Sequence, residues 1–316
     1  MIFFNFFIFI ICLAVIIKSG TLLVKSLIKI ARFLNLSEYV VAFILMAFAT
    51  SVPELFVGIT SAIKKVPIIS FGNIIGANIL NMTFAIGLVI LVARGINITE
   101  QHIKKDAWLI FFMALLPVLL AFDGILSRLD GFILLILFIW YITRLLGRRE
   151  HFDEKLNNIK NNRVGLREFL KNLELFFIGL VLLLVASWGL VESSSLIAIE
   201  AGFSLAIIGL ILIAIGTTLP EVSFGIRSVL LKHEKMTVGN FLGSVAFNSL
   251  VVLGLTAVIC PFKVDIRLAL MSILFLSLSL LIFNIFVRTK KRLSYREGII
   301  LLMLYGLFLI TTIFIG

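Results

Sequence analysis

Residues 47–54 read AFATSVPE and residues 214–221 read AIGTTLPE, so one short phrase occurs twice in a chain of 316 residues. Each copy ends in a Pro-Glu pair and lies within an apolar stretch. A second duplicated phrase reads GNIIGANILN at 72–81 and GNFLGSVAFN at 239–248. Equivalent positions are 167 residues apart for both phrases. The two halves of the chain therefore carry the same motifs in the same order.

The composition around these phrases is that of a membrane protein. The chain is 61% hydrophobic and 14% charged, with a mean hydropathy of +1.19, and a soluble domain of this length could not bury so much apolar surface. Several charge-free windows reach the roughly 20 residues that a helix needs to cross a bilayer. We predict an all-α polytopic membrane protein whose ten transmembrane helices cover residues 2–24, 39–63, 67–92, 106–122, 129–146, 174–194, 203–230, 237–260, 267–287 and 298–315.

The spans divide into two repeats of five. We expect a first repeat at 1–146, a basic linker at 147–172 and a second repeat at 173–316. Because five is an odd number, the second repeat must insert upside down relative to the first. Such inverted repeats are typical of secondary transporters, whose sites lie near the midplane between the repeats.

The distribution of positive charge predicts the orientation. Of the 28 Lys and Arg residues, 23 fall in connections on one side of the membrane and 5 on the other. Since positive connections favour the cytoplasm, both termini should be extracellular and the 147–172 linker cytoplasmic, in a multi-pass protein of the cell membrane. The net charge of +11 is thus explained by topology, and we expect no nucleic-acid partner.

Each duplicated phrase places an acid where ionisation is costly. Glu54 is the only charged residue between Glu38 and Lys64, and Glu221 is the only one between Glu200 and Arg227. An isolated carboxylate there would cost several kcal/mol. The neighbouring span cores contain no Lys or Arg, so a bound cation or a proton must offset the charge. Pro53 and Pro220 precede the acids, and proline frees the carbonyl one turn earlier, which makes it available as a ligand for a hard cation.

Other oxygen atoms recur at fixed distances from the acids. Hydroxyl residues stand three and four positions before each glutamate, on roughly one helix face. Asn81 and Asn248 each follow their glutamate by 27 residues, and a helical hairpin of that length returns to the starting depth. We therefore expect two carboxylates and two amides at the centre of one four-helix site. For Asn73 and Asn240 two roles stay open: a structural role, in which they cap helices or pair across them, and a role in the site.

These residues and motifs resemble the sodium/calcium exchanger family of the cation/calcium exchanger superfamily, in its prokaryotic type. The resemblance covers essentially the whole chain, and it rests on the G-T-S-x-P-E and G-N-x-x-G-S-x-x-x-[ND] phrases of each repeat. It implies that Glu54, Glu221, Asn81 and Asn248 form the Ca²⁺ centre. It also implies flanking Na⁺ sites lined by the carbonyls of Ala47 and Ala214 and by side-chain oxygens of Thr50, Ser51, Thr217, Thr218 and Ser244.

Three positions depart from the family pattern. Ala49 replaces a motif glycine, and Ala77 stands where a serine hydroxyl is usual, which removes one oxygen from an expected Na⁺ site. Asn248 stands where microbial members often carry aspartate, so the site holds two acids instead of three. Two acids still balance one Ca²⁺, so these changes affect Na⁺ coordination more than Ca²⁺ coordination.

The predicted function is exchange of Ca²⁺ for Na⁺ across the membrane by alternating access. A proton/calcium exchanger that uses the same two glutamates is the closest alternative, and K⁺-dependent or Mg²⁺-linked exchange is a weaker variant. A passive cation channel is a third class. We predict no enzyme activity, because the spans lack the paired Asp, Ser/His pair or H-E-x-x-H phrase of a membrane protease. The expected partners are membrane lipid and the transported ions, with no cofactor and no obligatory protein partner.

Overall fold

The fold is helical, with two short strand pairs. The computed structural model describes residues 2–33, 47–97, 101–146, 165–201, 208–230, 234–289 and 292–315. Within them the α-helices are α1 (Ile2–Phe33), α3 (Ala47–Thr50), α4 (Val52–Ile63), α5 (Ile68–Leu80), α6 (Ile86–Ala93), α7 (Gln101–Leu120), α8 (Arg128–Leu146), α9 (Leu166–Ala201), α11 (Ala214–Leu230), α12 (Glu234–Phe247), α13 (Leu253–Ile259), α14 (Ile266–Thr289) and α15 (Tyr295–Ile315). Shorter elements are the π-helical segments η2 (Asn81–Ala85), η6 (Gly209–Ile213) and η7 (Asn248–Val252), the 3₁₀ turn η3 (Ala121–Asp123), and the strands β1 (Ile96–Asn97), β2 (Ile125–Leu126), β3 (Phe262–Lys263) and β4 (Arg292–Leu293).

Many of these helices can cross a membrane. Among the described residues, seven stretches are long and apolar enough: Ile68–Ala93, Lys104–Asp123, Leu166–Ile197, Gly209–Leu230, Thr237–Ile259, Ala269–Arg288 and Tyr295–Thr312. Two further apolar helices, Phe3–Ser19 and Val52–Ile63, are shorter. The prediction of an all-helical membrane protein is thus confirmed. The starts of the predicted spans 39–63 and 203–230 lie outside the described residues.

Helix ends differ from the prediction around the linker. Helix α1 continues to Phe33, beyond the predicted end of the first span at residue 24. Helix α9 begins at Leu166, so the last seven residues of the predicted 147–172 linker are helical. Residues 147–164 are outside the described part of the chain. The polar residues at both helix ends extend the helices past the apolar stretch, and hydropathy alone does not detect such an extension.

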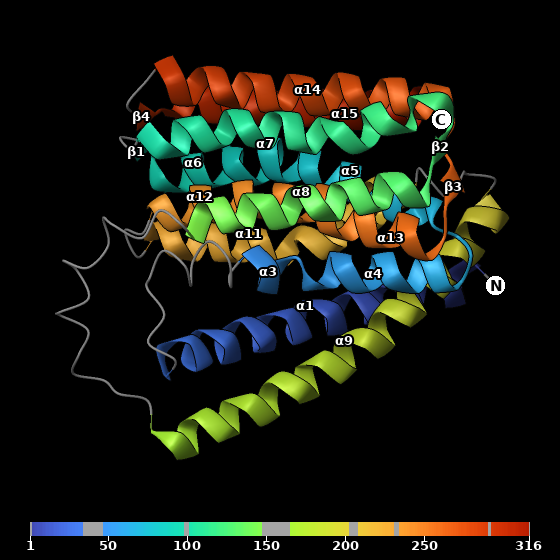
Figure 1. Cartoon of the computed structure of the whole chain (residues 1–316), viewed down its shortest axis with the longest axis horizontal. Helices are drawn as coiled ribbons and strands as arrows, with labels where there is room; N and C mark the ends of the chain where they lie inside the picture. The colour runs from blue at the N-terminus through green and yellow to red at the C-terminus, as the bar shows by residue number, and fades with distance from the viewer. Residues whose placement is uncertain are drawn as a thin grey trace.

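The separation of 167 residues between the two halves holds for the elements as well as the motifs. The segments η2 and η7 begin 167 positions apart, and so do β2 and β4 and the helices α8 and α15. The strands pair between the halves: β1 pairs antiparallel with β4, and β2 with β3. The two pairs lie at opposite ends of the helix bundle (Figure 1). The connections that follow α6 and α13, which are equivalent in sequence, therefore lie at opposite ends.

Two glycine crossings also join the halves. A Cβ atom on Gly254 of α13 would lie 3.1 Å from the carbonyl oxygen of Gly131 in α8. A Cβ atom on Gly298 of α15 would lie 3.1 Å from the carbonyl oxygen of Gly87 in α6. These four glycines form two equivalent pairs at the same separation of 167 residues. Small residues let membrane helices approach to backbone contact, so each half closes on the other at the same two points.

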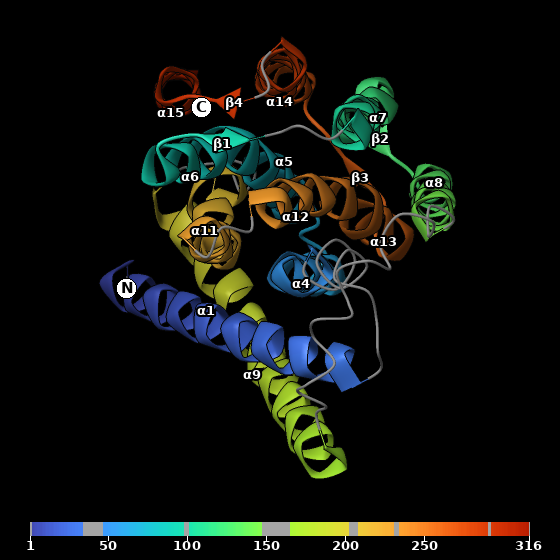
Figure 2. The same cartoon turned by 90° about the vertical axis from the view of Figure 1, so that its left-hand side faces the viewer.

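The long helices α1 and α9 pack on each other and lie on the outside of the bundle (Figure 2). Their own apolar core contains Phe9, Ile16, Leu183 and Leu190, packed with residues of α4 and η6. A larger core fills the remaining helices. At one end of the pair, Lys29 Nζ lies 2.8 Å from a carboxylate oxygen of Glu168. The α1–α9 pair thus meets the bundle across a core of its own.

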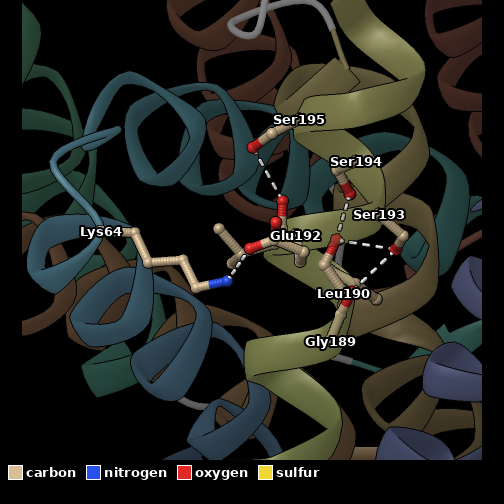
Figure 3. A network of polar contacts seen from close by, with 8 residues as sticks. Lys64, Gly189, Leu190, Glu192, Ser193, Ser194 and Ser195 are labelled. Carbon is tan, nitrogen blue, oxygen red and sulfur yellow. Dashed lines mark hydrogen bonds and ion pairs between the residues drawn. The ribbon is translucent and has the colours of Figure 1, made fainter.

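A polar contact fastens α9 to the turn after α4 (Figure 3). Lys64 forms an ion pair with Glu192, and its Nζ lies 4.2 Å from the centroid of the Trp188 ring. Trp188 and Glu192 stand one helical turn apart on α9, so one lysine bridges both. The hydroxyls of the three serines that follow, 193–195, donate to carbonyls of their own helix. The side chain of Lys64 is 13% exposed and that of Glu192 59%, so the ion pair lies at the surface of the protein with its lysine partly covered.

Candidate functional site

The two copies of the Pro-Glu phrase adopt different backbones. In the first half the helix is interrupted at Ser51, and Pro53 and Glu54 lie in the first turn of α4, where the missing proline N–H is not needed. In the second half Pro220 lies inside the continuous helix α11, which follows the π-helical segment η6. The same sequence pattern therefore forms two local structures: a helix start in the first half and the interior of a continuous helix in the second.

Carbonyl oxygens near the prolines accept bonds from nearby hydroxyls. The carbonyl of Ala47 accepts from the backbone of Ser51 at 3.0 Å and from the Thr50 hydroxyl at 3.4 Å. The carbonyl of Ala214 accepts from the hydroxyl of Thr218. The carbonyl of Ala214 also accepts from the Thr217 hydroxyl at 3.5 Å, so each of the two carbonyls has two hydrogen-bond donors in the structure.

A π-helical segment begins at each duplicated asparagine. Asn81 opens η2 and Asn248 opens η7, in the interiors of otherwise α-helical spans. Single π turns of this kind are frequent at functional sites because they shift side chains and leave carbonyls unpaired. Helix α4 packs against η7, and helix α11 packs against η2. Each glutamate-bearing helix therefore contacts the asparagine segment of the other half.

The two carboxylates are buried together. Glu54 and Glu221 are both 0% exposed, and they are close enough for their charges to interact. Thr217 lies beside Glu54, whereas Thr50 and Ser51 lie beside Glu221. The Ser51 hydroxyl is 3.5 Å from Oε1 of Glu221. Within the described residues, neither acid forms an ion pair, so protein charges do not balance the two carboxylates.

Several oxygens of this cluster have no hydrogen-bond donor among the residues that the structure describes. They are both carboxylate oxygens of Glu54, Oε2 of Glu221, and Oδ1 of Asn81 and of Asn248. Buried polar atoms normally have partners, so these five oxygens, which lie on helices and π-helical segments that pack against one another, need an explanation. Carboxylate and amide oxygens are the ligands that hard cations such as Ca²⁺ prefer. The described residues contain no group of three or more His, Cys, Asp or Glu side chains, and the cluster uses two acids with amides instead.

Two crossed hydrogen bonds link the halves beside the acids. The Thr50 hydroxyl donates to Oδ1 of Asn240 at 3.2 Å, and the equivalent Thr217 hydroxyl donates to Oδ1 of Asn73 at 3.1 Å. In the structure, both asparagines pair with a side chain of another helix. The pairing is with the threonine of the opposite half.

The two sides of the cluster differ in hydroxyl content. Thr50 also lies 3.4 Å from the hydroxyl of Ser244. The position equivalent to Ser244 is Ala77, which is buried and has no hydroxyl to offer Thr217. The departure noted in the sequence thus removes the hydroxyl that would be the counterpart of Ser244 in the Thr50–Ser244 contact.

Two polar residues were not predicted as site residues. Asn78 donates from Nδ2 to the Ser249 hydroxyl at 2.8 Å, and its Oδ1 accepts from Nδ2 of Asn248 at 3.4 Å. Asn78 lies within a duplicated phrase, but its equivalent is Val245, so the sequence left its role open between a structural residue and a site residue. The only sequence feature that could have marked Ser249 as a site residue is its position next to Asn248.

Comparison with known proteins identifies the family of the chain. The family model described as sodium/calcium exchanger protein matches residues 4–147 and 171–314. The chain is 30% identical over 299 residues to a putative antiporter, CaxA, of Alkalimonas amylolytica, with 93% of each chain covered. It is 27% identical to the sodium/calcium exchanger MaX1 of Methanosarcina acetivorans, over 98% of this chain and 99% of that protein.

Solved structures give the same relationship. The sodium-calcium exchanger NCX_Mj, soaked with 10 mM Na⁺ and 10 mM Sr²⁺, is 26% identical and superposes with a TM-score of 0.69, covering 97% of this chain and 98% of that one. The chain therefore belongs to the sodium/calcium exchanger protein family, whose members are membrane antiporters for cations and calcium and not enzymes.

Proposed function

We propose that this protein exchanges Ca²⁺ for Na⁺ across the cell membrane, with Glu54 and Glu221 as the central ligands of the transported ion. The observation that carries the proposal is the group of five buried oxygens without donors, on two glutamates and two asparagines. The relatives named sodium/calcium exchanger support the identity of the ions.

Charge and ligand type both favour Ca²⁺ as one substrate. Two ionised carboxylates balance one divalent cation, so their burial together ceases to be costly when the ion is bound. Ca²⁺ takes six to eight oxygens, about 2.3–2.6 Å away. The two carboxylates and the Oδ1 atoms of Asn81 and Asn248 provide up to six, and the neighbouring hydroxyls can complete the shell.

Na⁺ would bind at flanking positions that share the acids. On one side the ligands would come from Ala47, Thr50, Ser51 and Ser244, and on the other from Ala214, Thr217 and Thr218. The short distances among Thr50, Ser244, Ser51 and Glu221 support the first group. Since both ions need the same carboxylates, Ca²⁺ and Na⁺ would exclude each other, and this exclusion couples their movements.

The proposed architecture is ten spans in two inverted repeats, at 1–146 and 173–316, joined by a cytoplasmic linker at 147–172. Strand pairs that join the halves at opposite ends of the bundle support the inversion (Figure 1). The excess of Lys and Arg on one side supports extracellular termini. For alternating access, α1 and α9 would move against the remaining helices, and their separate apolar core supports such a division.

Exchange of Ca²⁺ for protons is the second candidate. It is favoured by one observation, the absence of a hydroxyl at Ala77 beside Thr217. A carboxylate can exchange a proton for a metal ion without any further ligand, so a depleted Na⁺ shell would not harm a proton-coupled cycle.

A flux experiment separates the candidates. The purified protein is reconstituted in liposomes loaded with Na⁺, and uptake of ⁴⁵Ca²⁺ is followed after dilution into Na⁺-free buffer. We expect uptake that requires the Na⁺ gradient and persists when a protonophore removes any pH gradient. Ca²⁺ uptake that does not depend on the Na⁺ gradient and that stops when the protonophore is added would establish the proton-coupled alternative. Passive Ca²⁺ flux without either gradient would indicate a channel.

A further inference from the structure

The side chain of Asn248 presents a problem of orientation. An asparagine amide has an oxygen at one end and an NH₂ group at the other, and the two ends have nearly the same shape. Only the oxygen attracts a cation. An aspartate presents oxygen in either rotation, so a site that has asparagine in this place needs a neighbour that fixes the rotation.

The structure provides such a neighbour. Nδ2 of Asn248 donates to Oδ1 of Asn78 at 3.4 Å, and Nδ2 of Asn78 donates to the hydroxyl of Ser249 at 2.8 Å. Because the NH₂ group of Asn78 is used by Ser249, its oxygen is the end that faces Asn248. The NH₂ group of Asn248 is thereby turned toward Asn78. Its Oδ1 is left buried without a donor among the described residues.

This chain of bonds exists on one side of the cluster only. The positions equivalent to Asn78 and Ser249 in the other half are Val245 and Met82, which offer no hydrogen bond of this kind. Accordingly, neither amide atom of Asn81 has a hydrogen-bond partner in the described part of the chain. The three polar side chains are nearly or fully buried, so water does not compete for their bonds.

We propose that Asn78 is a positioning residue that holds the Asn248 amide with its oxygen toward the transported cation, and that the Ser249 hydroxyl, which accepts from Asn78, favours the rotation in which the Asn78 oxygen faces Asn248. The proposal rests on the proposed function, since it assigns Asn248 Oδ1 to the ion. It predicts that Asn78 matters because residue 248 is an asparagine. With aspartate at 248, the amide of Asn78 can rotate to donate to the carboxylate, and no orientation has to be selected.

The test is a double-mutant cycle in reconstituted liposomes, read as the KM of ⁴⁵Ca²⁺ uptake. Asn78→Val is made in the wild-type protein and in Asn248→Asp, valine being the residue at the equivalent position 245. In the wild-type background we expect KM to rise about tenfold, which corresponds to about 1.4 kcal/mol and lies within the range of one hydrogen bond. In the Asn248→Asp background we expect a change of less than about twofold.

Two further variants keep the test decisive. Ser249→Ala frees Asn78 to rotate, and we expect a smaller rise in KM that also disappears with Asn248→Asp. Val245→Ala is the packing control: it removes buried volume at the equivalent place and should change KM less than about twofold. If Asn78→Val does not yield folded protein, the Ser249→Ala cycle answers the same question.

The failures are distinguishable. Wild-type protein that carries no Ca²⁺ would overturn the proposed function and this inference with it. Wild-type protein that transports Ca²⁺, with Asn78→Val and Ser249→Ala effects that are absent or equal in the two backgrounds, would overturn the positioning role alone.

Discussion

At the scale of single residues, the two buried glutamates are equivalent in sequence but not in surroundings. Glu221 has the Ser51 hydroxyl 3.5 Å from Oε1, whereas both oxygens of Glu54 lack a donor among the described residues. Buried anions without donors are unstable unless a cation joins them. The burial of both acids without a balancing charge among the described residues therefore fits the proposed divalent cation, of whose charge each acid would balance half.

Replacing either acid by its amide should remove Ca²⁺ transport. For Glu54→Gln and Glu221→Gln we expect ⁴⁵Ca²⁺ uptake to fall at least about a hundredfold, since a buried charge pair is worth several kcal/mol. Glu174→Gln, which neutralises an exposed acid on α9, is the control and should transport normally. Unchanged uptake in either buried variant would remove that glutamate from the site.

The hydroxyl difference between Ser244 and Ala77 also belongs to this scale. Ser244→Ala removes the hydroxyl 3.4 Å from Thr50, and we expect a several-fold weaker dependence of uptake on internal Na⁺ with a smaller change in the KM for Ca²⁺. Ala77→Ser restores the missing hydroxyl on the other side and should strengthen the Na⁺ dependence. Measuring both ion dependences in both variants checks this, and equal effects on the two ions would contradict separate Na⁺ ligands.

At the scale of elements, local backbone irregularities position the polar groups. The helix break at Ser51 and the π-helical segments η2 and η7 all fall where duplicated polar residues lie. Each irregularity is buried, in accord with the rule that non-helical backbone at membrane depth must be enclosed by protein. The turn after α4 adds a polar contact to α9, through Lys64.

The Lys64–Glu192 contact should stabilise the attachment of α9. We expect Lys64→Glu to lower the thermal midpoint in detergent by roughly 1–3 °C, because it replaces an ion pair worth about 1 kcal/mol by repulsion. The charge exchange Lys64→Glu with Glu192→Lys should recover most of the loss. Lys65→Glu, at the exposed neighbouring position, is the matched control. A double variant no more stable than Lys64→Glu alone would contradict a direct pairing.

At the scale of the whole molecule, the two halves meet through equivalent contacts. Each of these contacts has a counterpart in which the two halves swap roles. The strand pair β1–β4 corresponds to β2–β3, and one glycine crossing corresponds to the other. Helices of one half thus pack closely on helices of the other, so the cluster of acids and amides depends on both halves.

A methyl group at a glycine crossing should disturb this interface. The Cβ atom of Gly131→Ala would lie 2.6 Å from the carbonyl oxygen of Gly254, closer than any relaxed contact. We expect a loss of stability of about 1–3 kcal/mol, seen as a lower thermal midpoint and a lower yield of monodisperse protein. Gly306→Ala on α15 meets no atom within 4 Å and should be neutral or slightly stabilising. Equal behaviour of the two variants would show that the crossing tolerates separation.

Much of the fold could be predicted because its signals are local. Hydropathy marks membrane helices, and the duplicated phrases mark two halves at a constant separation. Helix ends were less predictable, since the polar residues at 25–33 and 166–172 continue helices beyond the apolar stretch. Local patterns could not predict the hydrogen-bond partners of Asn73, Asn240 and Asn78, because each partner lies more than 140 residues away in the chain.

The amino-acid sequence by itself determined that this is a membrane protein, that it has two related halves, and that each half carries one acid in an apolar span. These properties follow from the transfer of side chains out of water, which each segment undergoes independently of the others. Only the tertiary structure decided which threonine meets which asparagine, where the helices widen into π turns, and that Asn78 contacts Asn248. Those outcomes depend on how two helices from different halves are rotated against each other, and packing sets that rotation.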